Sequence, residues 1–421
     1  METLVAMQAV FPRWWVTWLL VALVGFSIGY WVFTSALLWY RQRRKRVSFH
    51  GSLPSVVFLR PVKRGVPQLT EKAGRLIAAA RPGDWVIFVV DTPEDEAACR
   101  TACRWACEGV YTEVLTAPQL TGVWNPKIAK LITLTASLGN HAPEHWILSD
   151  CEAVPDPAFM ERFRREWAAL ERKCPNVLLT AGYRFTGATR FFQQLDQFPS
   201  LLTLWPGLVV TEWADKGKGL GYTLGACTGL RKRDLQVIGG WESMLAYLAE
   251  DHRLGAELAK AGHPTRLSRE VLPLDSDPLG LIDWIRHQHR VSFTYRVCNP
   301  AGFLGMGLIQ GSMAGLLLAL INPAAWWSWS LLAVLFLARA VTALVNAASL
   351  GYRVRHPARF GVMSFLASMI ETIFWAAAWL PLPVRWGRRT LKVGRDGQFS
   401  GAKFDQTSLA SEGSFHYQSD A

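Results

Sequence analysis

Long apolar runs stand on both sides of a mixed segment in this chain of 421 residues. An uncharged run from Trp14 to Tyr40 exceeds the roughly 20 residues that a transmembrane helix needs. Further along, Phe303–Ile321 and Trp326–Leu350 are apolar and are separated by an Asn-Pro-Ala-Ala turn, which predicts a helical hairpin. A fourth run, Gly361–Leu380, carries Glu371 near its middle. The pattern predicts membrane helices near both ends of the chain.

The segment from Leu53 to about Asp275 instead alternates short apolar strands with amphipathic stretches. This repeat predicts an α/β fold with a mostly parallel sheet. Cys99, Cys103 and Cys107 recur every fourth residue, which would stack them on one helix face as small buried residues; a metal or redox role is the alternative. Strands are predicted at Ser55–Val62, Trp85–Asp91, Thr112–Ala117 and His145–Asp150, and helices at Gln68–Ala80, across the cysteines and from Asn125 to Leu138.

The distribution of charged residues predicts which side of the membrane the central segment faces. The formal net charge is +12, and basic clusters border the apolar runs at Arg41–Arg46, Tyr352–Arg359 and Arg385–Arg389. This placement favours an anionic membrane surface over nucleic acid, and the positive-inside rule puts the central segment in the cytoplasm. A crossing by Gly361–Leu380 would put the last basic cluster on the other side, whereas an interfacial or re-entrant helix would not. The pattern leaves both open, as it does a pairing of Arg339 with Glu371.

Carboxylates follow the predicted strands. Asp91 closes one strand, Asp150 closes another with Glu152 two residues on, and Asp251 follows a Gly-rich segment. Ligands of parallel sheets bind at the carboxyl ends of the strands, although an Asp there is often only a helix cap or turn residue. Asp150 and Glu152 can reach one hard cation such as Mg²⁺ or Mn²⁺, and Asp251 suits a general base.

These residues lie in motifs that resemble the ceramide glucosyltransferase family and its bacterial hopanoid glycosyltransferase relatives. The resemblance covers residues 50 to 397. It implies a GT-A type nucleotide-sugar-binding domain and an inverting, metal-assisted transfer from a nucleotide sugar, usually a UDP-sugar, to a lipid hydroxyl. The motifs are FLRPVKRGV, VVDTPEDEA, NPKIAKL, WILSDCEAVPD, GACTGLRKRDLQVIGGW, YLAEDHRLG, RHQHRVSFTYR, NPAGF and WGRRTLKVGRDG.

The resemblance also implies a role for each site residue. Asp91 would contact the uridine end of the donor, and Asp150 with Glu152 would hold the divalent ion. Asp251 would be the general base, and Arg290 would stabilise the leaving UDP. The remaining substrate-binding candidates are Lys127, which would approach the donor phosphates, Glu250 and His287.

Two motifs depart from the family pattern. Where the family has Gln or Arg, two variable residues and Arg-Trp, this chain has His287 to Val291, with Arg290 kept and Val291 in the Trp position. The metal motif reads Asp-Cys-Glu rather than Asp-x-Asp, with Glu152 as the longer substitute. The missing Trp removes a stacking surface and bears on the fit of the acceptor.

The chain is therefore expected to divide into a membrane anchor with a basic stop (1–46), a cytoplasmic GT-A domain (47–298), C-terminal membrane helices (299–381) and a basic, then disordered, tail (382–421). We expect a multi-pass protein, in a bacterial inner membrane, that moves glucose or N-acetylglucosamine to ceramide or a hopanoid polyol. The alternatives are an inactive membrane scaffold or lipid-binding relative, and a polysaccharide synthase.

Overall fold

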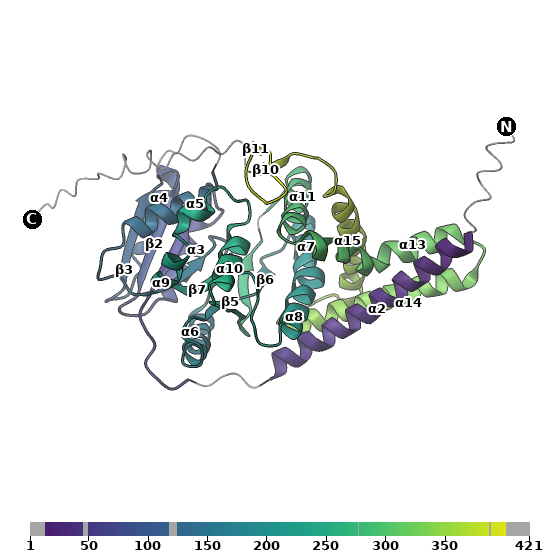
Figure 1. Cartoon of the computed structure of the whole chain (residues 1–421), viewed down its shortest axis with the longest axis horizontal. Coiled ribbons are helices and arrows are strands. Elements are labelled where there is room, and N and C mark those ends of the chain that lie inside the picture. The colour runs from purple at the N-terminus through teal and green to yellow at the C-terminus, as the bar shows by residue number, and fades with distance from the viewer. Residues whose placement is uncertain (1–12, 45–48, 118–123, 277, 387–388, 401–421) are drawn as a thin grey trace, which may run out of the picture.

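The computed structural model describes residues 13–44, 49–117, 124–276, 278–386 and 389–400. Its centre is a seven-stranded sheet in the order β3-β2-β1-β4-β7-β5-β8 (Figure 1). The pairs β3–β2, β2–β1, β1–β4 and β5–β8 are parallel, and only β7 runs antiparallel to both its neighbours. The predicted α/β fold with a mostly parallel sheet is confirmed. The strands are β1 (Val56–Pro61), β2 (Trp85–Val90), β3 (Tyr111–Thr116), β4 (His145–Ser149), β5 (Leu178–Thr180), β7 (Cys227–Arg231) and β8 (Thr265–Leu267), with β6 (Tyr183–Thr186) and β9 (Leu272–Asp275) as a separate parallel pair.

Alternating side chains of the central strands build two cores. Phe58 of β1 packs on one face against α3, α4 and α6, whereas Val57 and Leu59 pack on the other against α5 and α10. Because both faces are covered, the strands read as continuous apolar runs rather than as alternating ones. The helices of this part are α3 (Leu69–Ala78), α4 (Pro93–Cys103), α5 (Pro126–Ala136), α6 (Pro157–Glu171), α9 (Lys232–Val237), the 3₁₀ turn η2 (Trp241–Met244) and α10 (Glu250–Lys260).

The prediction that three cysteines share one helix face is wrong for Cys107. Helix α4 ends at Cys103, so Cys107 lies beyond it and is exposed, while Cys99 is buried. The chain has to leave the helix to enter β3, and it turns at Gly109, whose φ of 84° favours glycine.

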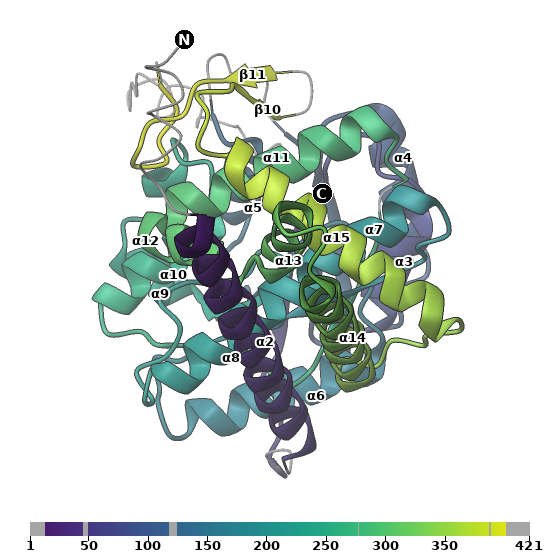
Figure 2. The ribbon, with the colours of Figure 1, turned by 90° about the vertical axis from the view of Figure 1, so that its right-hand side faces the viewer.

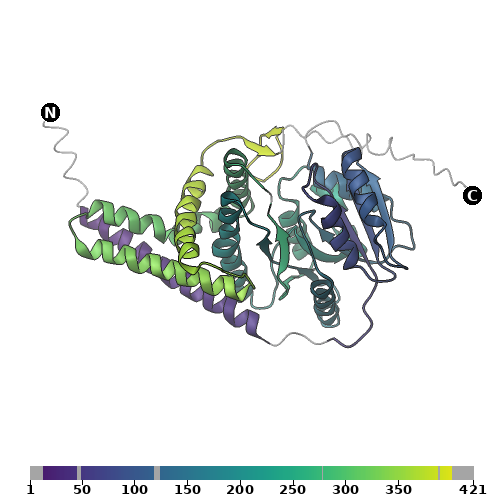
Figure 3. The same cartoon turned by 180° about the vertical axis from the view of Figure 1, so that it is seen from behind.

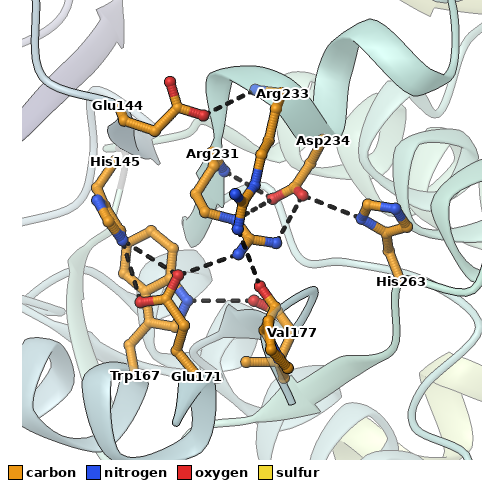
Figure 4. A network of polar contacts seen from close by, with 10 residues as sticks. Glu144, His145, Trp167, Glu171, Val177, Arg231, Arg233, Asp234 and His263 are labelled. Atoms are coloured by element: carbon orange, nitrogen blue, oxygen red, sulfur yellow. Dashed lines mark hydrogen bonds and ion pairs between the residues drawn. The ribbon is translucent and has the colours of Figure 1, made fainter.

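A buried polar network pins the amino end of β4 to its neighbour β7 (Figure 4). The Arg231 guanidinium donates to both carboxylate oxygens of Asp234, at 3.1 and 2.8 Å, and to Glu171 at 3.1 Å. His145 contacts the same Glu171, and His263 contacts Asp234 at 3.0 Å. Arg231 and Asp234 are almost fully buried, so this ion pair is satisfied within the protein. It lies at the opposite end of β4 from Asp150.

Helices α2, α13 and α14 extend from the sheet domain as one bundle (Figures 1 and 3). Helices α2, α14 and α15 are each long and apolar enough to cross a membrane, and α12 and α13 form a further candidate span bent by 46°. The apolar helices predicted near both ends of the chain are thus present, and the hairpin is formed by α13 and α14. The bounds are α2 (Arg13–Arg43), α12 (Pro300–Gly305), the 3₁₀ turn η3 (Met306–Ile309), α13 (Gly311–Ile321), α14 (Trp326–Ser349) and α15 (Pro357–Ala377).

A third core joins this bundle to the sheet domain. Leu38 of α2, Trp284 of α11 and Ala347 of α14 pack there with a long helical run. That run changes to π-helix just after Pro199, and the wider turn presents Thr203 to α15. The elements are α7 (Phe191–Pro199), the π-helix η1 (Ser200–Leu204), α8 (Trp205–Ala214) and α11 (Leu281–Cys298).

Arg339 and Glu371 do not form the direct pair considered from the sequence. Arg339 Nε donates to Ser368 Oγ at 3.0 Å, and its guanidinium lies 4.3 Å from the ring centre of Trp31. The Glu371 carboxylate instead accepts from Thr203 Oγ1 at 3.1 Å. Both of these charged side chains thus have a polar partner inside the apolar region, as burial away from water requires.

The chain after α15 returns to the sheet domain. Strands β10 (Val384–Trp386) and β11 (Arg389–Leu391) form a hairpin, and Val384, Leu391 and Phe399 pack with Leu248 and Phe293.

Candidate active site

A cavity of about 1320 Å³ opens at the carboxyl ends of β1, β2 and β4. Parallel sheets bind ligands at this edge because the strands end there together. One part of the wall is polar and belongs to the sheet domain, with Asp91, Lys127, Asp150, Glu250 and Asp251. The other part is mostly apolar and belongs to α2, η1, α8, α12 and η3, with Tyr30, Leu204, Leu208, Phe303 and Met306. A single space thus joins charged groups to the apolar bundle.

Asp91 lies at the end of β2 in an ion pair. Its Oδ2 is 2.5 Å from Nζ of Lys130. Lys130 is buried, and its Nζ also donates to the carbonyl of Val62. Lys130 therefore fixes Asp91 on the cavity wall, and Lys130 is itself held by the carbonyl group that follows β1.

The loop that carries Asp150 and Glu152 rests on a buried arginine. Arg60, fully buried at the end of β1, donates to Ser149 Oγ, to the carbonyl of Cys151 and to the carbonyl of Ala153, each at 2.8 Å. Burial lowers the pKa of Arg60, and the nearby thiol and carboxylates oppose this effect. These three bonds fix the backbone of the Asp-Cys-Glu turn.

Lys127 bridges two of the predicted site carboxylates. Its Nζ is 2.6 Å from Asp150 Oδ1 and 3.0 Å from Glu250 Oε1. Burial by itself would lower the pKa of Lys127, but Asp150, Glu250 and Asp251 together raise it well above its usual value. Lys127 is thus a permanent cation that ties α5 to β4 and to α10.

Asn125 supports this bridge. Its Oδ1 caps α5 by accepting from the backbone of Lys127 and Ile128, and Pro126 follows as the first helical residue. Its Nδ2 donates to Glu250 Oε2 at 2.8 Å. One buried side chain therefore sets both the start of α5 and the orientation of Glu250.

Asp251 is held by two backbone donors at the start of α10. Its Oδ1 accepts from His252 N at 2.8 Å and its Oδ2 from Gly225 N at 3.0 Å. Burial raises the pKa of Asp251 to about 6, the negative charge of Glu250 acts in the same direction, and Lys127 acts against both. A carboxylate with a pKa just below neutrality suits a general base.

Gly225 is the point where these groups converge. A Cβ at this position would lie 2.8 Å from Lys127 Nζ, 3.2 Å from Asp150 Oδ2 and 3.3 Å from Asp251 Oδ2. The missing side chain leaves room for three charged groups that come from different parts of the chain.

Arg290 enters the cavity from α11. Burial lowers its pKa, and Glu250, Glu152 and Asp196 act in the opposite direction. His287 lies one turn earlier, off the cavity wall, with Nδ1 3.3 Å from Arg290 Nη2 and Nε2 3.9 Å from Asp196 Oδ1. His287 therefore contacts Arg290 and does not itself line the cavity. Val291 does line the cavity.

Of the eight site residues predicted from the sequence, seven line this cavity and His287 does not. The sequence analysis missed Arg60, Asn125 and Gly225. Asn125 carried a usable signal, since an Asn before a Pro that starts a helix is a typical cap. Arg60 and Gly225 had none, because their roles depend on distant residues.

The candidate protein ligands for a divalent cation at this site are Asp150 and Glu152. Asp150 and Glu152 both line the cavity, and the described residues contain no group of three or more His, Cys, Asp or Glu that could hold a metal ion. Mg²⁺ commonly binds through one or two carboxylates and takes its other ligands from substrate phosphates and water. The donor set therefore suits an ion shared with a phosphorylated substrate.

Comparison with known proteins places the chain in a family. The model of "Glycosyl transferase family 21" matches residues 17–399, most of the chain, so the chain belongs to glycosyl transferase family 21. This family includes ceramide glucosyltransferases, which agrees with the resemblance seen in the motifs. No curated protein matches the chain.

Similar solved structures have low sequence identity. A mannosyltransferase from Pyrobaculum calidifontis, in complex with GDP-Man and Mn²⁺, is 13% identical, with 85% of this chain and 99% of that chain covered and a TM-score of 0.47. Glucosyl-3-phosphoglycerate synthase from Mycobacterium tuberculosis is 12% identical, with 58% and 81% covered and a TM-score of 0.32. The same synthase with Mg²⁺ and UDP is 13% identical, with 56% and 78% covered and a TM-score of 0.31.

Proposed function

We propose that this family 21 glycosyltransferase moves a sugar from a UDP-sugar to a hydroxyl group of a membrane lipid, with inversion at the anomeric carbon. The observation that carries the proposal is the single cavity that runs from the charged groups at the strand ends to the apolar helices. A water-soluble donor and a lipid acceptor need such a shared space, and neither a soluble enzyme nor a membrane anchor does.

The donor is proposed to lie at the sheet edge. Asp91 at the end of β2 would face the uridine, and Lys127 and Arg290 would face the diphosphate. Asp150 and Glu152 would hold the divalent ion, which when bound supplies positive charge where the diphosphate leaves. Lys127 and Arg290 add fixed cations at the same place, because salt bridges and burial hold both side chains within the cavity wall.

Asp251 is proposed to remove the proton of the attacking hydroxyl. Its two backbone hydrogen bonds fix the orientation of the carboxylate, and a pKa of about 6 leaves it mostly ionised at neutral pH. With one base and no carboxylate nucleophile, the acceptor oxygen attacks the sugar as UDP departs, which inverts the anomeric centre.

The acceptor is proposed to enter from the bilayer. Tyr30 of α2, Leu204 and Leu208 of the α7–α8 run, and Phe303 of α12 line the far part of the cavity. A lipid tail can stay among these groups while the headgroup reaches Asp251. Ceramide and a polyol-bearing hopanoid both fit this description, with glucose or N-acetylglucosamine as the sugar.

The catalytic domain is proposed to face the cytoplasm. In α2, Trp18 and Trp39 are exposed and about 31 Å apart at a rise of 1.5 Å per residue, which matches the hydrocarbon thickness of a bilayer. Arg43 follows this span on the side of the sheet domain, and Arg353 and Arg355 follow α14 on the same side. The positive-inside rule makes this side cytoplasmic.

The decisive experiment is a product screen. The full chain, purified in detergent with Mn²⁺, is incubated with UDP-glucose or UDP-N-acetylglucosamine and with ceramide or a hopane polyol, and the products are identified by mass spectrometry. A glycosylated lipid supports the proposal and names both substrates. A polysaccharide would indicate a synthase, and the absence of both product and Mn²⁺-dependent UDP binding would indicate a scaffold.

Two variants locate the chemistry once a substrate pair is known. Asp251→Asn is expected to abolish transfer and to keep UDP binding, whereas Asp150→Ala is expected to lose metal-dependent UDP binding. Asp156→Asn is the matched control, because it removes a carboxylate at the start of α6 and keeps a side chain able to cap that helix. Transfer that persists in Asp251→Asn would assign the base to another residue.

A further inference from the structure

Helix α15 is tied to the sheet domain at its first end. The Tyr352 hydroxyl, just before the helix, accepts from the backbone of Phe185 at 2.9 Å. Arg359, in the first turn, donates to Gln194 of α7 at 3.0 Å. At the same end of the helix, Phe360 packs on Phe198 of α7, with the two ring centres 4.9 Å apart.

The chain after α15 is tied to the same domain. Leu248 N donates to the carbonyl of Gly397 at 3.0 Å, and Phe399 N donates to the carbonyl of Ala246 at 2.9 Å. These bonds lie directly before Glu250 and Asp251, so the segment after α15 reaches the edge of the active site.

A crossing by α15 is incompatible with both attachments. Its 21 residues would be about 31 Å long, enough to traverse the hydrocarbon layer once and to leave its end on the far side. From Ala377 to Val384 the chain advances seven residues, which span at most about 25 Å when fully extended. This is shorter than the layer of about 30 Å that the chain would have to recross before Val384 packs in the cluster that contains Leu248 and Phe293.

The direction of α15 agrees with this limit. In Figures 1 and 3, α15 runs across the bundle of α2, α13 and α14 and lies beside α7, and Figure 2, which looks at the bundle from its end, again shows α15 beside α7. Ring contacts hold it to its neighbour α11, with Trp284 and Phe374 at 5.7 Å.

No residue that the structure describes covers one face of α15. Val362, Leu366 and Ile373 are 56%, 40% and 58% exposed, and their spacing puts them on one side of the helix. The opposite face is packed, with Gly361 against Ala340 and Ser368 bonded to Arg339. The exposed side chains are apolar, like Val334, Leu337 and Val341 on the neighbouring helix α14, which argues that lipid covers them.

Helix α11 and the loop before α15 also carry exposed side chains of the kinds that are found at a membrane boundary. Leu281, Ile282 and Ile285 are exposed at the start of α11. Arg353 and Arg355 are exposed in the loop. Exposed apolar side chains and exposed arginines are the two kinds of group that suit a leaflet whose acyl chains lie under acidic headgroups.

We propose that α15 does not cross the membrane but lies in the plane of the leaflet nearest the sheet domain. Its Val362–Ile373 face contacts acyl chains, and the arginines before it contact acidic phospholipid headgroups. The chain beyond α15 then stays on the side of the active site. The inference rests on the proposed membrane insertion of α2, α13 and α14, and it is independent of which sugar is transferred, or whether one is.

Side-specific cleavage of the full chain in sealed vesicles tests the topology. One protease site follows Ala421, a second is inserted in the turn at residues 322–325, and the exposed thiol of Cys107 reports the side of the sheet domain through an impermeant maleimide. We expect cleavage after Ala421 only in vesicles where Cys107 reacts, and cleavage in the turn only in vesicles of the opposite orientation. Cleavage of both sites from the same side overturns the inference.

A depth measurement tests the in-plane position directly. A genetically encoded fluorescent amino acid replaces Leu366 or Ile373, and lipids brominated at known depths quench it. An in-plane helix gives both positions the same depth, away from the midplane. A crossing helix puts Leu366 near the midplane and Ile373 about 10 Å shallower, and this result would refute the proposal. Leu19 and Phe26 of α2, also seven residues apart and exposed, are the matched control and should differ by about 10 Å.

Discussion

Gly225→Ala tests whether the active site depends on the convergence of its charges at one glycine. The new methyl group would lie 2.8 Å from Lys127 Nζ and 3.2 Å from Asp150 Oδ2. The φ of Gly225 is outside the left-handed region, so alanine meets no backbone strain there. The nearest atom is the end of a flexible lysine, which can move, and the fold should therefore survive the substitution.

The expected loss follows from that movement. An ordinary contact begins at 3.4 Å, so Lys127 Nζ has to withdraw by about 0.6 Å. This weakens its bond to Asp150, now 2.6 Å, or to Glu250, now 3.0 Å. Since a misplacement of about 1 Å can cost about 100-fold in rate, we expect kcat to fall between about 10-fold and 100-fold, or about 1.4 to 2.7 kcal/mol.

The assay is the transfer rate with the substrate pair found in the product screen, measured together with the melting temperature in detergent. Gly221→Ala is the matched control, because it lies in the same Gly-rich segment and its Cβ would have no atom within 4 Å. We expect the control to keep full activity and both variants to melt within about 2 °C of the parent. Equal kcat for Gly225→Ala and the parent would refute the argument that this glycine makes room for the charges.

Three further predictions concern the base, the acceptor and the fold. Because only ionised Asp251 accepts a proton, kcat/KM should fall about tenfold per pH unit below about 6. Lys127→Met should move this acidic limb of the pH profile to higher pH, because it removes the charge that lowers the pKa of Asp251; an unmoved limb would show that Lys127 does not influence the pKa of the catalytic base. Val291→Trp should change the acceptor KM and leave UDP binding intact, since Val291 lines the cavity; a loss of UDP binding in titration calorimetry would place it in the donor site instead. Asp234→Ala should destabilise the protein by up to about 3–5 kcal/mol, because buried Arg231 loses two of its three carboxylate hydrogen bonds and keeps the one to Glu171; the melting temperature in detergent should drop clearly, and an unchanged value would contradict the role given to this ion pair.

Much of the fold could be predicted from local pattern. Apolar runs such as Val56–Pro61 are buried on both faces in any sheet covered by helices, and Asn125-Pro126 marks the start of a helix wherever that helix packs. The error at Cys107 shows the limit of this reasoning, because a four-residue period continues across a helix end that the next strand imposes.

The candidate site, like the fold, could be predicted from the sequence only in part. The positions of Asp91 and Asp150 follow from strand ends, and strand ends can be read from the sequence. The bridge from Lys127 to Asp150 and Glu250 cannot, since it joins residues separated by up to 123 positions and needs the glycine at 225 to leave space.

Composition and periodicity by themselves determined that the chain has an α/β centre, apolar helices near both ends and acidic strand ends, because these depend on neighbours within a few residues. Only the tertiary structure decided where α15 lies and which partners the buried charges have. Glu371 bonds Thr203 rather than Arg339, and the carbonyl of Gly397 accepts from Leu248, which is distant in the sequence. The physical reason is that a buried polar group takes whichever partner the packing brings near it, and packing is a property of the whole fold.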